Sequence, residues 1–337
     1  MKYPETLEIK LAGTRYQTML RLSQLAGWNQ TAEQLEKLAS EFPESNLIAV
    51  YHQENQDIPA GSGLVIPIGE SMAWIGMILV DPEFRRKGIA SAIMQRCLQL
   101  AENTLNCRVI GLDATPMGHH VYQKLGFEPS FQIWRCTMAT NESIAIDSGL
   151  VVEPIDDLTV CFDFIKEIDF GYKVPWFSLI KKLSLPYLWV AKQNHRIAGL
   201  IMSRPGRLRP HIGPLVAESS AVARTLLASV LGYWNSKGKL EVFIDIPEFH
   251  FEKGANPTGC SFIQNVEISR PFIRMYRMPQ VDQSPPDKTD GAKEKTESEN
   301  TGVLKMNLLP ADIAVEFVSN ERDSLKYLFA CGGPELS

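Results

Sequence analysis

The sequence predicts an α/β protein in which a mixed, mostly antiparallel sheet flanked by helices is built twice along the chain. Three observations predict it. Strand-like and helical runs alternate through residues 7–138, and the apolar run at residues 74–80 returns at 211–216. The chain has 337 residues, of which 45% are hydrophobic and 22% charged, so it is long enough for two cores. We expect an N-terminal domain at 1–139 and a C-terminal domain at 150–337.

Local patterns define the elements of the first domain. Thr31 and Gln34 have the spacing of a capping box, and Gly27 and Gly126 follow apolar helical runs that they would end. The run at 74–80 is apolar almost throughout, which is typical of a central strand covered on both faces. In order, the predicted elements are a strand at 7–11, helices at 16–26 and 32–42, strands at 46–52, 63–68 and 74–80, a helix from 88, a strand at 109–112, a helix at 118–125 and a strand at 131–138.

The second domain repeats this order. Residues 221–233 have a helical pattern and follow 211–216, as the helix from Gly88 follows 74–80. Further on, residues 242–245 match 110–113, and 272–278 match the strand that ends at Met138. The chain is therefore interpreted as a tandem duplication of one fold.

Composition changes near the C-terminus. Residues from about 281 to 302 contain no aromatic side chain and are rich in Pro, Ser, Lys, Glu and Asp, which predicts a flexible insertion. Apolar residues return at 325–329, where we expect the chain to dock back as a strand.

Charge and cysteine content exclude several classes of function. A formal net charge of −5 provides no basic field for nucleic acid or an anionic membrane. The six cysteines lie far apart and show no zinc-binding spacing, which favours a reduced, cytoplasmic protein without metal. With no apolar run near the roughly 20 residues of a membrane helix, we expect neither secretion nor membrane insertion.

A basic turn at residues 80–90 joins the apolar strand to an amphipathic helix. The free N–H groups at a helix start favour anions, and Gly88 would let a ligand approach the backbone closely. Arg85, Arg86 and Lys87 add positive charge, so the turn suits a pyrophosphate. The plainer alternative is a solvated basic turn.

These residues resemble the GNAT acetyltransferases, whose signature of Arg or Gln, two residues, Gly, one residue, and Gly or Ala is matched by Arg85, Gly88 and Ala90. The flanking segments 80–82 and 122–127 also match the family pattern. The resemblance implies acetyl-CoA as cosubstrate and a tandem protein with a degenerate second domain. It assigns the cofactor contacts to Ile78, Leu79, Val80, Arg85, Arg86, Lys87, Gly88, Ile89 and Ala90, and catalysis to Tyr122.

The resemblance also implies roles for these groups. In the family, pantetheine pairs with the strand carried here by residues 78–80, and a bulge there directs backbone N–H toward the thioester carbonyl. Tyr122 occupies the position that gives a proton to the departing CoA thiolate; its other reading is a core tyrosine. The sequence departs from the family at Thr115 and Gly118, where Asn and Ala are common, so one pantetheine hydrogen bond of the family would be lost here or made by Thr115 instead.

Several other residues have two possible roles each. Glu83, Asp113, His119 and His120 are candidates by proximity for the base that deprotonates the amine, and a surface role is the alternative for each. Trp28 would line an acceptor pocket or simply pack in the core. The arginines at 204, 207 and 209 would bind a substrate anion or form a solvated turn.

The predicted function is transfer of an acetyl or short acyl group from acetyl-CoA to a primary amine of a small molecule or peptide. The alternatives are a non-catalytic acyl-CoA sensor and a scaffold protein. We expect residues 1–145 to bind acetyl-CoA alone and the second domain to bind none, because segment 217–224 has no glycine, Glu218 is acidic, and Pro214 weakens a pantetheine ladder. That domain would then cover the acceptor side or form a subunit interface, as in a homodimer.

Overall fold

The computed structural model describes residues 7–53, 56–167, 179, 182, 187–252, 259–278 and 328–330. The strands are β1 (Leu7–Leu11), β2 (Asn46–Gln53), β3 (Gln56–Ile68), β4 (Met72–Val80), β5 (Val109–Ala114), β6 (Glu128–Ala139), β7 (Val151–Ile155), β8 (Tyr187–Gln193), β9 (Arg196–Arg204), β10 (His211–Ala217), β11 (Glu241–Pro247), β12 (Glu267–Arg277) and β13 (Leu328–Ala330). The α-helices are α1 (Gln17–Leu25), α2 (Ala32–Glu41), α3 (Ile89–Gln99), α4 (Pro116–Gln123), α5 (Phe162–Glu167) and α7 (Ser220–Ser236).

One continuous sheet runs through the described chain in the order β1-β2-β3-β4-β5-β12-β6-β11-β10-β9-β8-β7, with β13 beside β10. Its pairs are antiparallel except β4 with β5 and β10 with β11, which are parallel. The order is symmetric about its centre. We call residues 7–139 the first half and residues 150–278 the second half.

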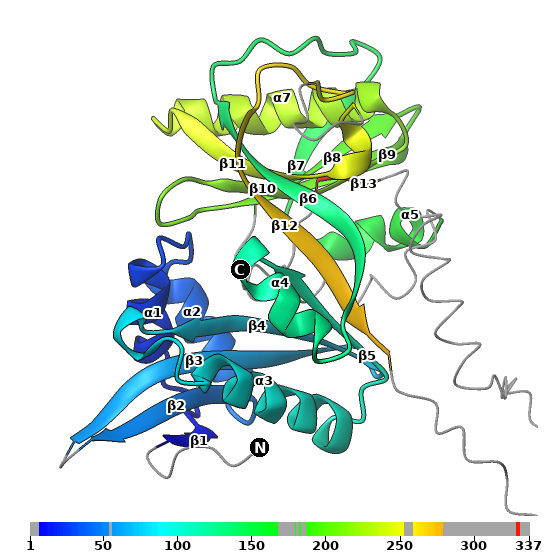
Figure 1. The fold of residues 1–337 in the computed structure, drawn as a ribbon. Coiled ribbons are helices and arrows are strands. Elements are labelled where there is room, and N and C mark those ends of the chain that lie inside the picture. Colours follow the sequence, from blue (N-terminus) through cyan, green and yellow to red (C-terminus); the bar gives the residue numbers. More distant parts are fainter. Residues whose placement is uncertain are drawn as a thin grey trace, which may run out of the picture.

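The two central strands are exchanged between the halves. β12, from the second half, lies between β5 and β6 of the first, and β6 lies between β12 and β11 of the second. Figure 1 shows β6 and β12 crossing side by side from one half to the other. A domain division at residues 139–150 stays a prediction, but each half takes a strand from the other.

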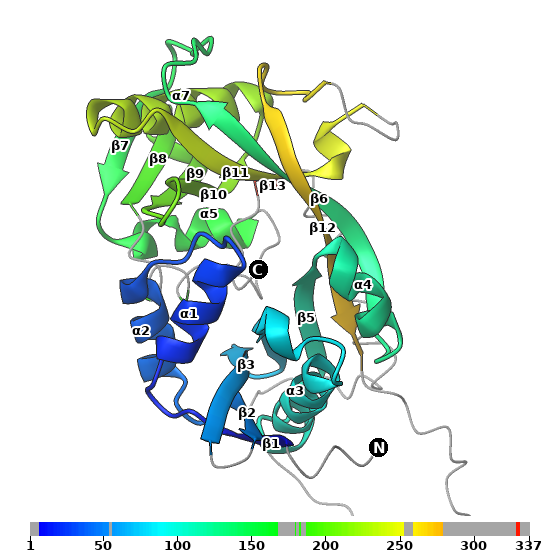
Figure 2. The same cartoon turned by 60° about the vertical axis from the view of Figure 1, so that its left-hand side comes forward.

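Helices cover both faces of the sheet. In the first half, α1 and α2 contribute Met19, Leu22 and Leu35 to one face, while α3 buries Ile93 and Cys97 on the other. Figure 2 shows α1 and α2 on one side of this half and α3 on the other. The core of α1 and α2 is continuous with α5, β8 and β9, so the halves share it.

The predicted strands and helices are confirmed wherever the chain is described. Thr31 and Gln34 form the predicted capping box: the Gln34 N–H donates to the Thr31 hydroxyl, and the Thr31 N–H donates to the Gln34 side chain. α4 begins at Pro116, two residues before its predicted start at Gly118, because a proline favours the first helical position.

The C-terminal predictions fall partly outside the description. The strand expected at 325–329 is confirmed at 328–329, which belong to β13 (Leu328–Ala330), and residues 325–327 lie outside the described residues. The insertion expected at about 281–302 lies outside the described residues. Within the described segments, no helix combines the length and apolar character needed to cross a membrane.

Candidate active site

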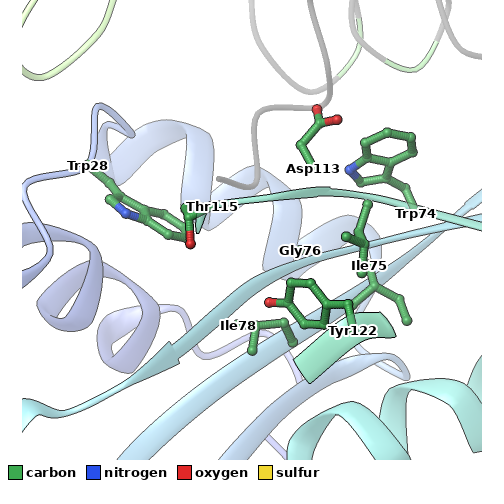
Figure 3. A pocket seen from close by; sticks show the side chains of 9 residues that line it. Trp28, Trp74, Ile75, Gly76, Ile78, Asp113, Thr115 and Tyr122 are labelled. Carbon is green, nitrogen blue, oxygen red and sulfur yellow. The ribbon is translucent and has the colours of Figure 1, made fainter. Parts of the chain in front are cut away.

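β4 and β5 part to form a pocket. They pair only where Met72–Trp74 meets Val109–Gly111, and beyond Trp74 none of the described strands pairs with this edge of β4. A Cβ on Gly111 would lie 2.7 Å from the Trp74 ring, so glycine is needed where this ring crosses β5. The pocket holds about 420 Å³, its open mouth included, and is lined by Trp28, Trp74, Ile75, Gly76, Ile78, Leu112, Asp113, Thr115 and Tyr122, as Figure 3 shows.

The predicted bulge lies at Met77. Its φ is 55°, and the register between β3 and β4 shifts between Ser62 and Leu64. The Ser62 hydroxyl donates to the Met77 carbonyl at 2.9 Å, which fixes the bulge. Of the predicted strand contacts, Ile78 lines the pocket, whereas Leu79 is buried and Val80 pairs with Gly61.

The turn after β4 has an open backbone at the start of α3. Gly88 is its N-cap with a φ of 76°, no side chain caps the helix, and a Cβ on Gly88 would meet nothing within 4 Å. Arg86 also has a positive φ, 62°. Left-handed residues in a turn before a helix start direct backbone N–H groups toward an anion, and Gly88 leaves room beside them.

The turn is anchored by Asp81. Its carboxylate accepts hydrogen bonds from the Glu83 N–H at 3.1 Å and from Arg21 at 2.5 Å. Burial alone would raise the pKa of Asp81, but these hydrogen bonds and the Arg21 charge hold it below its usual value. The exit from β4 is therefore fixed before the chain reaches Gly88.

The basic side chains of the turn differ in their contacts. The Lys87 ammonium lies 4.7 Å from the ring centres of both Tyr51 and Phe84, so it packs on aromatic faces. Arg85 donates to the Val80 carbonyl at 3.5 Å, and Arg86 is exposed. Farther on, Ile89 is buried in the core below α3 and Ala90 is half-buried.

Tyr122 projects from α4 into the pocket. Figure 3 shows its ring beside Ile78. The ring also lies against Gly118, where a Cβ would come within 2.8 Å, so the departure from Ala there has a steric reason. Burial raises the pKa of the Tyr122 phenol to about 12, which keeps it protonated at neutral pH. Thr115 lines the same pocket.

Among the four candidate bases, Asp113 lines the pocket, whereas Glu83, His119 and His120 do not. Asp113 accepts two hydrogen bonds of 2.9 Å from Arg274 on β12. Sequence reasoning missed Trp74 as a pocket residue and Arg274 as the partner of Asp113. The match of 110–113 with 242–245 was the available signal, because both segments end in an aspartate that meets an arginine.

A loop of the second half supports Trp28. The Asn29 side chain accepts from the N–H groups of Leu208 and Arg209 at 2.9 and 3.2 Å, and donates to the Arg209 carbonyl at 2.9 Å. The Arg207 Nε donates to the Trp28 carbonyl at 3.0 Å. Neither interpretation of the arginines at 204, 207 and 209, a substrate-anion site or a solvated turn, included these internal contacts. Arg209 also pairs with Glu241 at 2.6 Å, and Arg204 is buried beside His211.

In the second half, β10 and β11 correspond to β4 and β5, but the region between them is different. Ser219 caps α7 by accepting from the Val222 N–H, and Glu218 at this helix start binds Arg196. β13 pairs with β10 at Leu215 and Val216 and also contacts β11. It therefore occupies the place that corresponds to the pocket between β4 and β5 in the first half.

Comparisons with known proteins agree with this geometry. Residues 15–127 match the model of the acetyltransferase (GNAT) family. The uncharacterized N-acetyltransferase YitH of Bacillus subtilis (strain 168) is 28% identical over 253 residues, which cover 72% of this chain and 82% of that protein.

Solved structures extend the likeness in fold. A GCN5-related N-acetyltransferase from Sphaerobacter thermophilus has a TM-score of 0.60 at 13% identity, covering 83% of this chain and 99% of its own. A tandem GNAT protein from the clavulanic acid biosynthesis pathway has a TM-score of 0.54 at 13% identity, with 81% and 98% covered. The N-terminal half thus matches the GNAT acetyltransferase family, and the chain as a whole is similar in fold to a tandem protein of that family.

Proposed function

We propose that the first half transfers an acetyl or short acyl group from acetyl-CoA to a primary amine by direct attack. Acyl transfer is the activity of the acetyltransferase (GNAT) family, whose model matches residues 15–127. The observation that carries the finer proposal is the continuous path from the open edge of β4, past the bulge at Met77, to the uncapped start of α3 at Gly88. This path offers unpaired backbone to pantetheine and space to a pyrophosphate.

Each group along the path has one task in the reaction. A bound ammonium group first gives one proton to water. The neutral amine nitrogen then attacks the thioester carbonyl carbon, so a C–N bond forms, the C–S bond breaks, and the second proton lost by nitrogen also passes to water. Backbone N–H groups at the bulge stabilise the negative charge that develops on the carbonyl oxygen. Tyr122 gives its proton to the thiolate and regains one from water.

A thiol-release assay tests this proposal. The full chain with acetyl-CoA is screened against primary amines, polyamines, amino acids, aminoglycosides and peptides, and release of free CoA should depend on the acceptor. Acetyl-CoA binding without release of thiol with any acceptor would favour the sensor alternative. Absence of acetyl-CoA binding would contradict both and leave a scaffold.

A further inference from the structure

We propose that Asp113, held in place by Arg274 of the second half, is the anchor for the acceptor's ammonium group, and that the acceptor is a primary amine on an apolar or aromatic body without a carboxylate. This inference rests on the proposed function and specifies its acceptor. The pocket wall at Ile78 and Tyr122 belongs to the thioester, which leaves the wall of Trp28, Trp74 and Asp113 to the acceptor.

Asp113 is placed to accept a further hydrogen bond. Arg274 donates one bond to each of its oxygens, at 2.9 Å, and a carboxylate oxygen has two lone pairs. The Asp113 side chain keeps 13% of its surface exposed, whereas Arg274 keeps 3%, so the pocket meets the carboxylate and the guanidinium lies beneath it. A charge-assisted bond from an ammonium group is the strongest that this surface can accept.

The rest of the acceptor wall favours an apolar body. Asp113 is the one charged residue among the nine that line the pocket, and the indoles of Trp28 and Trp74 supply apolar and cation-attracting surface. None of the described residues that line the pocket is basic. Arg274 is already paired with Asp113 and only 3% exposed, so a carboxylate on the acceptor would meet the Asp113 carboxylate with no cation that it can contact, which disfavours α-amino acids.

Arg274 acts as a positioning residue from the other half. It comes from β12, where it lies directly opposite Asp113, and its guanidinium stands 4.9 Å from the Trp74 ring centre. It therefore orients both the carboxylate and one aromatic wall. The acceptor side is incomplete without the exchanged strand.

The test compares two probes that differ by one carboxylate, 2-phenylethylamine and L-phenylalanine. Binding to the full chain saturated with CoA is followed by tryptophan fluorescence, and turnover with acetyl-CoA by thiol release. We expect 2-phenylethylamine to bind at least tenfold more tightly and to be acetylated with a higher kcat/KM. Equal binding, or tighter binding of L-phenylalanine, would overturn the inference. Tight binding of 2-phenylethylamine without turnover would support the anchor and contradict the proposed function.

A variant pair localises the effect. Asp113→Asn should weaken 2-phenylethylamine binding at least tenfold and leave acetyl-CoA affinity unchanged. The matched control is Asp245→Asn, because Asp245 forms the equivalent pair with Arg135 outside the pocket, and it should change neither affinity. Unchanged amine binding in folded Asp113→Asn would overturn the role of Asp113. If that variant does not fold, the comparison of the two probes on the wild-type chain still decides.

Discussion

Arg135 of β6 binds Asp245 of β11 through two hydrogen bonds of 2.7 Å, although the two residues come from different halves of the chain. The same contact joins Arg274 of β12 to Asp113 of β5 in the opposite direction. Each exchanged strand therefore carries an arginine to the aspartate of the other half. The two halves are tied by a pair of equivalent, buried ion pairs as well as by the sheet.

This exchange argues against the expectation that residues 1–145 act alone. A fragment ending there lacks β12, so Asp113 loses Arg274, and β5 and β6 lose the strand between them. We predict that the fragment shows no thermal shift with acetyl-CoA, and that adding residues 146–337 restores the shift. Binding by the fragment alone with the dissociation constant of the full chain would contradict this account.

The pair at Asp245 should make stability depend on acidic pH. Burial alone would raise the pKa of Asp245, but the Arg135 and His211 charges hold it at about 2, below its ordinary value of 3.8. Because the pKa of Asp245 is lower in the folded state than in the unfolded state, the stabilisation is complete above about pH 4 and is lost as pH falls toward 2. The contribution to the free energy of unfolding is roughly 2 kcal/mol.

Urea denaturation of the wild type and Asp245→Asn checks this dependence. The difference in unfolding free energy between the two proteins should shrink as the pH falls from about 4 toward 2, the range in which Asp245 becomes protonated. A difference that stays the same across the whole range would show that Asp245 has no depressed pKa in the folded protein.

Sequence patterns could predict the elements but not the exchange. The repeat of 110–113 in 242–245 indicates two similar strands, yet a strand's sequence does not say which chain segment lies next to it. β6 and β12 are equivalent strands of the two repeats. The same apolar alternation would therefore result whether each strand stayed in its own half or was exchanged with the other. For this reason the turn at Gly88 could be found from local signals, whereas the contact of Arg274 with Asp113 required the three-dimensional arrangement.

Tyr122→Phe keeps the ring packing and removes only the proton donor. We predict that turnover falls by about 10² to 10⁴, the usual scale for general acid catalysis, with little change in acetyl-CoA affinity. Tyr233→Phe is the matched control, because burial likewise raises the pKa of Tyr233 to about 12 but it lies on α7. Undiminished turnover of Tyr122→Phe, where chemistry limits the rate, would return Tyr122 to a packing role.

β13 should protect the edge of β10. It pairs with Leu215 and Val216, at the place that corresponds to the open edge of β4. Removing residues 328–337 should therefore speed hydrogen exchange at the backbone amides of β10 and leave those of β4 unchanged. Equal exchange in β10 with and without these residues would mean that β13 does not pair with β10 in solution.

Calorimetric titration of acetyl-CoA into the full chain counts its cofactor sites, of which we propose one at Gly88 and none in the second half. Gly88→Glu puts bulk and negative charge in the open space beside the helix start. Gly238→Glu is its control, since Gly238 has a similar φ of 72° and equally open surroundings. We predict one site per chain in the wild type and in Gly238→Glu, and no binding in Gly88→Glu. Two sites per chain, or a site that survives in Gly88→Glu, would contradict the account.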